Sequence, residues 1–356
     1  MRLAKRKYVK QALSQWMNGV GPDSEVVISS RVRIARNIRN MPFPLMADPS
    51  RSLSVMEQLL GVAESGRLNG LGKIEQIRLT DLTELEKLVL VEKHLISPNL
   101  ANDSRNGALI LSPNEDISVM INEEDHLRIQ CLSSGFQVHE AWDAASKIDD
   151  IFEEQVDYAF DEKHGYLTSC PTNVGTGIRV SVMMHLPALV MTGQINRILS
   201  AVTQVGLAVR GLYGEGSEAT GNLFQVSNQI TLGQSEQEII ENLFQVARQM
   251  IEHEKSARSK LLTESRLRVE DRVRRSFGIL SQAIIMDSKE ASQRLSDIRL
   301  GVHLGLLPEV NELVLNELLV STQPGFLQMT FGEAMSPEDR DRSRAELIRS
   351  RLATIS

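Results

Sequence analysis

The segment VMINEEDHLRIQC (Val119–Cys131) carries three consecutive acidic residues between two apolar runs. Apolar and polar residues alternate from Leu127 to Cys131, and a further apolar run, ALIL, lies upstream at residues 108–111. Alternation with period two is typical of strands, so we expect paired strands with the acidic residues at the turn. Charged side chains are costly to bury unless they are paired or functional. The segment is therefore either a polar hairpin edge or part of a functional site.

The composition of the 356-residue chain limits its class. With 42% hydrophobic and 24% charged residues it is typical of a soluble globular protein with room for two domains. No apolar run approaches the roughly 20 residues that cross a bilayer, and the net charge of −7 disfavours nucleic-acid binding. The two cysteines, Cys131 and Cys170, lack the spacing of a metal or redox pair. We expect a cytoplasmic protein that binds neither nucleic acid nor a membrane.

Hydrophobic periodicity predicts an α+β fold. Helices are expected at Tyr8–Met17, 51–66, 81–96, Glu140–Phe160 and Ile195–Val205. Strands are expected in Glu25–Asn37, at the end of Gly165–Pro187, and on both sides of the loop Gly211–Asn222. These elements interleave without a regular βαβ rhythm, which favours an antiparallel sheet flanked by helices over a doubly wound sheet.

The character of the sequence changes near Ser235, after which only helical spacing continues. Helices are expected at Lys289–Leu306 and Asn311–Leu319, and a last one begins with Ser336 as N-cap and Pro337 at the first helical position. We therefore predict a catalytic domain over residues 1–258 and an all-helical C-terminal domain over residues 259–356.

Four short motifs share one order along the chain. They are SSRVR (Ser29–Arg33), NEEDHLR (Asn122–Arg128), CPTNVGTGIR (Cys170–Arg179), and RGLYGEGSE (Arg210–Glu218) followed by VSN (Val226–Asn228). In sequence, order and spacing, roughly residues 20–255 resemble the phosphagen (guanidino) kinases. Members of that family transfer the γ-phosphoryl group of ATP to a guanidinium nitrogen. The resemblance implies a guanidino-kinase-like catalytic domain that uses ATP and Mg²⁺.

The resemblance also implies an ATP site rich in arginine, a side chain whose planar fork binds phosphate without losing its proton. The matching positions are Ser29, Ser30, Arg31, Arg33, His94, Arg128, Arg179, Met183 and Arg210. Two of the family's positions differ in this chain: Met183 replaces a histidine that packs on adenine, and Tyr213 replaces a phosphate-binding arginine. Glu123 is expected near the water shell of the magnesium ion rather than as a direct ligand.

The acceptor guanidinium has a pKa above about 12, so a carboxylate must orient it and remove a proton. Glu124 matches the catalytic carboxylate of the family, and Cys170 matches its reactive cysteine. A second carboxylate is expected from the loop after Arg210. Glu218 matches by position, whereas Glu215 directly follows Gly214 in the run expected to face the ATP phosphates, and both stay open as candidates.

Two departures point to a protein substrate. Only 28 residues precede Ser29, whereas small-molecule guanidino kinases have there a helical domain that closes over the free amino acid. Near the C-terminus, Arg340, Asp341, Arg344 and Ala345 form an RDxxRA pattern. This pattern resembles the allosteric phosphoarginine pocket of bacterial protein-arginine kinases, which mark misfolded proteins for Clp-type unfoldases.

We therefore expect an ATP-dependent kinase for arginine side chains in proteins, with a role in stress response and protein quality control. The resemblance suggests further partners: a Clp-type unfoldase or protease, an activator protein, and a second copy of the chain bound through the helical domain. The alternatives are a kinase for free arginine or another small guanidino compound, and a phosphoarginine-binding adaptor with an inactive kinase domain.

Overall fold

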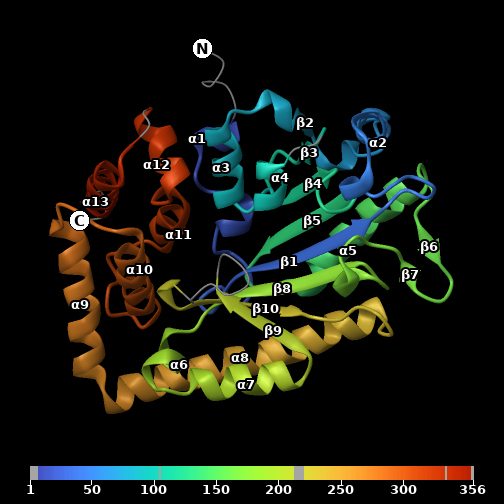
Figure 1. Ribbon diagram of the computed structural model, residues 1–356. Coiled ribbons are helices and arrows are strands. Elements are labelled where there is room, and N and C mark those ends of the chain that lie inside the picture. The colour runs from blue at the N-terminus through green and yellow to red at the C-terminus, as the bar shows by residue number, and fades with distance from the viewer. Residues whose placement is uncertain (1–6, 104–105, 212–219, 333–334, 354–356) are drawn as a thin grey trace.

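An antiparallel sheet forms the centre of the computed structural model, which describes residues 7–103, 106–211, 220–332 and 335–353 (Figure 1). Eight strands lie in the order β2-β3-β4-β5-β1-β8-β10-β9. They are β1 (Val27–Arg36), β2 (Glu75–Arg78), β3 (Ala108–Leu111), β4 (Ile117–Ile121), β5 (Leu127–Ser134), β8 (Ile178–His185), β9 (Leu207–Gly211) and β10 (Leu223–Asn228). A separate two-stranded ribbon joins β6 (Phe160–Asp161) and β7 (Gly165–Tyr166).

The two faces of this sheet differ in polarity because side chains alternate along each strand. On β1, Val32 and Ile34 point into the main hydrophobic core. That face packs against α5 (Val138–Glu153) and α8 (Glu236–Glu264), which contact β1, β5, β8 and β10. Arg31 and Arg33, at the alternate positions, therefore belong to the opposite face.

Several elements distant in sequence cover part of the arginine face. A 3-10 turn near the N-terminus, η1 (Gln15–Met17), packs with α3 (Glu84–Glu92) and α12 (Pro324–Phe331) in one apolar cluster that includes Trp16, Val89 and Phe326. The other helices of this half of the chain are α1 (Lys7–Lys10), α2 (Pro49–Glu64), α4 (Pro98–Asn102), α6 (Pro187–Met191) and α7 (Ile195–Gln204). In Figure 1, α7 and α8 lie below the sheet and α3 and α4 above it.

The C-terminal part of the described chain is helical. After α8 come α9 (Arg266–Gln282), α10 (Ser288–His303), α11 (Glu312–Ser321), α12 and α13 (Pro337–Ala353), which gather at the left of Figure 1. The expected N-cap of α13 is present, because the Ser336 hydroxyl accepts a hydrogen bond from the backbone N–H of Asp339. The α+β fold class is confirmed. The domain boundary near residue 258 stays a prediction, and α8 runs through that position without a break.

Two expected helices were too long. The expected helix Tyr8–Met17 is divided into α1 and η1, because these residues follow the surface of α3 instead of presenting one apolar stripe. The helix expected to reach Phe160 ends at Glu153. Beyond it, Tyr158 pairs with Ile38 as an isolated β-bridge and Phe160 begins β6, so backbone pairing with other segments replaces the helical turn.

Candidate active site

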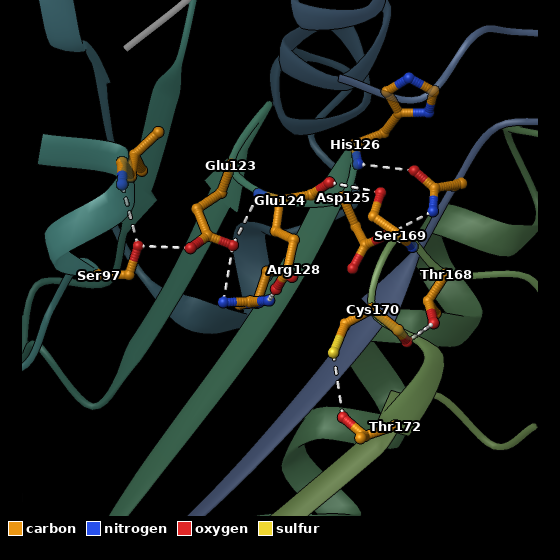
Figure 2. A network of polar contacts seen from close by, with 12 residues as sticks. Ser97, Glu123, Glu124, Asp125, His126, Arg128, Thr168, Ser169, Cys170 and Thr172 are labelled. Atoms are coloured by element: carbon orange, nitrogen blue, oxygen red, sulfur yellow. Dashed lines mark hydrogen bonds and ion pairs between the residues drawn. The ribbon is translucent and has the colours of Figure 1, made fainter. Parts of the chain in front are cut away.

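The acidic turn between β4 and β5 carries an arginine brace. The strands pair from Ile121 opposite Leu127 onward, which leaves residues 122–126 as the turn. Arg128, the second residue of β5, reaches back to both glutamates: its two terminal nitrogens lie 2.7 Å from Glu123 Oε2 and 2.8 Å from Glu124 Oε2 (Figure 2). The predicted paired strands and charged turn are therefore present. The charged side chains of this turn are tolerated because Arg128 pairs with both glutamates.

Glu123 is fully engaged in this arrangement. Its side chain is 1% exposed, and it accepts hydrogen bonds from the Ser97 hydroxyl at 2.6 Å and from the backbone N–H of Glu124 at 2.8 Å. The buried carboxylate of Glu123 therefore holds the guanidinium of Arg128 in a fixed orientation. The expected contact of Glu123 with the water shell of magnesium stays a prediction.

The predicted phosphate-binding arginines come together over the central strands. Arg33 on β1 lies directly opposite Arg179 on β8, and Arg31 lies opposite Ser181. A cavity of about 220 Å³, named here the arginine cavity, opens between them. Its polar lining includes Arg31, Arg33, His94, Ser97, Arg128, Gln130, Arg179, Arg210 and Gln225. Sequence segments separated by more than a hundred residues thus converge on one site.

Packing cations so closely has an electrostatic cost. Burial, together with the charges of Arg179 and Arg128, lowers the pKa of Arg31 to about 10. Burial and neighbouring arginines likewise lower the pKa of Arg33. The Nε of Arg33 is also buried without a hydrogen-bond partner among the described residues. Arg128 is the exception, since Glu123, Asp125 and Glu124 outweigh its burial and raise its pKa. A bound polyanion such as the triphosphate of ATP would relieve this repulsion and supply acceptors, so these residues fit that group.

His94 lies at one end of the arginine cavity, just beyond the end of α3. Its backbone has φ of 58°, in the left-handed region, and its carbonyl accepts a hydrogen bond from Gln130 Nε2 at 2.8 Å. Burial and the nearby charge of Arg31 lower the pKa of His94 to about 4. The ring is therefore neutral at pH 7 and does not add to the positive charge of the cavity.

A second cavity, of about 100 Å³, is lined by Glu124 and Cys170 and is named here the acceptor cavity. Glu124 is one-third exposed, and its side chain points toward the same region as Cys170 in Figure 2. The thiol of Cys170 lies 3.0 Å from the Thr172 hydroxyl. Arg33, Arg128 and Arg179 line both cavities, so the two spaces share one wall.

A hydrogen-bond network fixes the acidic turn to the loop before Cys170. Asp125 is completely buried, and its Oδ1 accepts from the backbone N–H of Ser169 and from Asn37 Nδ2, both at 2.7 Å. Ser169 also donates its hydroxyl to the carbonyl of Glu124. Nearby, Gly177 has φ of +68°, and a Cβ there would lie 2.6 Å from the Ala35 carbonyl oxygen, so this turn requires glycine.

The remaining predicted site residues are distributed unevenly. Ser29 and Met183 line a narrow extension of the arginine cavity. The hydroxyl of Ser30 donates to the carbonyl of Gly135 and accepts from the backbone N–H of Gln137, so this side chain does not line the cavity. Tyr213, Glu215 and Glu218 lie outside the described residues. The roles assigned to all these residues stay predictions.

The RDxxRA pattern lies on α13. Arg344 is 2% exposed and donates to the carbonyl oxygens of Thr322 at 2.9 Å and Met286 at 2.8 Å. It also pairs with Asp341 at 2.5 Å. Ala345 is buried, whereas Arg340 is partly exposed. Arg344 therefore already fastens α13 to the segments before α10 and α12, and binding of phosphoarginine here stays a prediction.

Among the residues that sequence reasoning missed in the lining of the arginine cavity and its extension are Trp16, Ser97, Gln130 and Gln225. Gln130 follows Arg128 by two positions on one strand, so its place on the same face was available from the alternation. Gln225 lies opposite both Met183 and Arg210 in the sheet, which only the strand register reveals. Trp16 and Ser97 come from helical segments whose packing has no local sequence signal.

Among the described residues, no group of three or more His, Cys, Asp or Glu side chains is placed to hold a metal ion. The described helices also include none whose length and apolar character would let it cross a bilayer.

Comparison with known proteins assigns both parts of the chain. Residues 55–257 match the family model for the C-terminal catalytic domain of ATP:guanido phosphotransferases, and residues 266–356 match the model named protein-arginine kinase McsB C-terminal domain. Among solved structures, lombricine kinase superposes with a TM-score of 0.58 at 23% identity, covering 70% of this chain and 72% of that one. The duplicated taurocyamine kinase of Schistosoma mansoni also gives 0.58, at 24% identity, over 70% of this chain and 35% of that one. These two likenesses show the shared fold.

Curated relatives are more similar. A protein-arginine kinase of Brevibacillus brevis is 57% identical over 353 residues, covering 99% of both chains. The protein-arginine kinase of Bacillus subtilis is 55% identical over 347 residues, covering 98% of this chain and 95% of its own. The predicted family is confirmed: the chain is an enzyme of the ATP:guanido phosphotransferase family and belongs to its protein-arginine kinase branch.

Proposed function

We propose that this enzyme transfers the γ-phosphoryl group of ATP to the guanidinium of arginine side chains in proteins. The observation that carries the proposal is the wall shared by the two cavities. Arg33, Arg128 and Arg179 face both the arginine cavity, which suits a triphosphate, and the acceptor cavity beside Glu124. A phosphoryl group passing from one cavity to the other would remain next to these three cations throughout, and such charge neutralisation is the main requirement of phosphoryl transfer.

In the proposed step, a guanidinium nitrogen attacks the γ-phosphorus in line while the bond from that phosphorus to the β–γ bridging oxygen breaks. ADP leaves, and the proton lost by the attacking nitrogen passes to the carboxylate of Glu124. Arg128 holds Glu124 by one oxygen, which fixes the direction of the carboxylate. Mg²⁺ would be bound chiefly through the phosphates of the nucleotide, whose charge it helps to neutralise.

The names of the relatives support a protein substrate rather than free arginine. Two curated relatives that match nearly the whole chain are protein-arginine kinases, and the C-terminal helices match a domain named for such a kinase. An arginine on an unfolded or flexible segment is therefore the proposed acceptor.

The wider role follows from the same resemblance. We propose that the enzyme acts in the cytoplasm during stress, marks damaged proteins for a Clp-type unfoldase or protease, and works as a homodimer with an activator protein. The helical C-terminal part would bind phosphoarginine at the RDxxRA residues and so regulate the kinase. Arg340, partly exposed beside Asp341 on α13, is the cation available to such a ligand.

The test compares phosphate incorporation from ATP into casein with incorporation into free arginine. The product on casein should be labile in acid and stable in base, as expected for a P–N bond. Glu124→Ala should lower the rate by about 10²–10⁴-fold, the usual range for loss of a general base, whereas Glu252→Ala, at an exposed position on α8, should leave it unchanged.

Three results would contradict parts of the proposal. Labelling confined to free arginine would show a small-molecule kinase instead. Absence of any ATP-dependent labelling, together with binding of phosphoarginine, would show an adaptor with an inactive kinase domain. Full activity of Glu124→Ala would remove that carboxylate from the mechanism while leaving the reaction itself intact.

A further inference from the structure

The N-terminal segment reaches the nucleotide side of the site. Its Trp16 lines the narrow extension of the arginine cavity, together with Ser29 and Met183. The extension continues the main cavity, because Arg31, His94 and Gln225 line both. None of the four motifs that carry the family resemblance includes Trp16, which lies well before the first of them.

A buried lysine fixes this segment in place. Lys93 is fully buried and donates hydrogen bonds to the backbone carbonyls of Tyr8 at 3.0 Å and Gln11 at 2.8 Å. Its ammonium group also lies 2.6 Å from Glu115, which accepts a further hydrogen bond from the Ser14 hydroxyl. Charge-assisted bonds of this kind are stronger than neutral ones. Trp16 is therefore held against the end of α3 rather than lying loosely on the surface.

The combined cavity changes polarity along its length. One end carries Arg33, Arg128 and Arg179, which suit a triphosphate. The extension shares Arg31 with the main cavity but adds the apolar side chains of Trp16, Leu132 and Met183 beside the ring of His94, which is neutral at pH 7. ATP has the same asymmetry, with a polyanionic chain at one end and an uncharged aromatic base at the other. If the triphosphate of ATP lies beside the three arginines, its base lies toward Trp16.

Trp16 also has an unmet hydrogen bond. The side chain is 2% exposed, and its Nε1–H, which can only donate, is buried without a hydrogen-bond partner among the described residues. The indole meets the ring of His94 edge to face, with ring centroids 5.9 Å apart and planes at 63°. A buried donor left unpaired is destabilising, and the ring nitrogens of a purine are acceptors that could pair with it.

We propose that Trp16 is a base-binding residue of the ATP site: the edge of its ring faces the edge of the purine, and its Nε1–H donates to a purine ring nitrogen. The inference rests on the nucleotide site of the proposed function. About 10 Å³ of free volume remains in the extension, so the base displaces a side chain on entry. Met183 suits this, since its unbranched thioether repacks readily.

Fluorescence provides the test, because Trp16 and Trp142 are the only two tryptophans in the chain. Trp142 lies on α5 and packs against the core on the other face of the sheet. Trp142→Phe therefore leaves Trp16 as the single emitter without altering the site. Titration of this variant with Mg·ADP should change its emission saturably, whereas inorganic tripolyphosphate, which has no base, should leave the emission nearly unchanged.

A second test measures the affinity of the Trp16→Phe variant for the same two ligands. Trp16→Phe keeps an aromatic ring but removes the donor, so it should weaken Mg·ADP binding by about 3–10-fold, the value of one hydrogen bond. Binding of tripolyphosphate by the same variant should change less than about twofold, because its partners are the arginines. A general loss of folding would weaken both ligands equally, so the ratio of the two effects reports the base contact.

The outcomes separate this inference from the proposed function. If wild type binds Mg·ADP but the emission of Trp16 does not respond, or if Trp16→Phe weakens both ligands equally, Trp16 does not contact the base while the nucleotide site stands. If wild type binds neither Mg·ADP nor tripolyphosphate, the nucleotide site itself is wrong, and the inference is overturned with it.

Discussion

The hydroxyl of Ser169 donates a hydrogen bond to the backbone carbonyl oxygen of Glu124 at 2.7 Å. Glu124 belongs to the NEEDHLR motif and Ser169 directly precedes the CPTNVGTGIR motif, so the bond joins the acidic turn to the loop before Cys170. The backbone N–H of Ser169 binds Asp125 in addition, so a single residue fixes two members of the turn. The position of the proposed catalytic carboxylate relative to the acceptor cavity therefore depends on Ser169.

Ser169→Ala should consequently lower kcat with little effect on the KM for ATP. Removing one neutral hydrogen bond costs about 0.5–1.5 kcal/mol, and the looser carboxylate should reduce kcat by about 3–10-fold. Steady-state kinetics with a fixed protein substrate would measure both constants. Ser200→Ala is a matched control, because Ser200 is exposed on α7 and its hydroxyl donates to the carbonyl of Asn196 on the same helix. Equal kinetics for the two variants would contradict the positioning role.

The two cysteines should react at different rates. Cys170 is partly exposed and lines the acceptor cavity, whereas Cys131 is buried in the core, where burial raises the pKa of its thiol. Since the thiolate is the reactive form, a disulfide reagent such as DTNB should modify Cys170 quickly and Cys131 only after unfolding. Cys170→Ser should remove the fast phase, and an arginine-containing peptide with ATP should slow it. A fast phase that survives in Cys170→Ser would contradict this assignment.

Local patterns predicted much of the sheet and of the arginine site. Strict alternation in β1 placed Arg31 and Arg33 on one face, and the same rule identified the hairpin that carries Glu123 and Glu124. Such features depend on neighbours in sequence, so a single segment contains the information. The α+β class followed because strands and helices interleave without a βαβ rhythm.

Contacts between distant segments could not be predicted in this way. Glu92 on α3 accepts hydrogen bonds from the backbone N–H groups of Gly325 at 2.7 Å and Phe326 at 2.8 Å, across more than 230 residues. Likewise, Trp16 lines the extension of the arginine cavity because the N-terminal segment packs against α3. Neither contact can be predicted from hydrophobic periodicity, since each depends on how whole helices and strands pack against one another in the folded protein.

Glu92 should make the stability of the fold depend on pH. Burial raises the pKa of its carboxyl from 4.5 to about 7, although the N–H groups of Gly325 and Phe326 act in the opposite direction. Between these two values the folded protein keeps a proton that the unfolded chain has released. The protonated Glu92 carboxyl therefore contributes to the free energy of unfolding at low pH, and this contribution is lost as pH rises through 7. The loss is about 3 kcal/mol at most.

Urea denaturation between pH 5 and pH 8 would measure this effect. Glu92→Gln cannot titrate, so wild type should lose free energy of unfolding relative to this variant as pH increases. Glu346→Gln, at an exposed position on α13, should follow the wild-type curve over the whole range. Parallel curves for wild type and Glu92→Gln would mean that the carboxyl does not hold its proton in the folded state.

Substitution of Arg344 and substitution of Arg340, the two arginines of the RDxxRA pattern, should affect the stability of the fold differently. Arg344 is buried and donates to the carbonyls of Thr322 and Met286. Arg344→Ala leaves these acceptors unpaired and opens a cavity, so it should lower the free energy of unfolding by about 2–4 kcal/mol.

Arg340→Ala, at a partly exposed position on the same helix, should change stability by less than about 0.5 kcal/mol. Arg340→Ala is therefore the variant that tests ligand binding without loss of the fold. It should weaken binding of free phosphoarginine, measured by calorimetry, by about tenfold or more, because a charge-assisted bond to phosphate is lost. Unchanged phosphoarginine affinity in Arg340→Ala, with the fold intact, would show that α13 has only a structural role and that any regulation by phosphoarginine acts at another site.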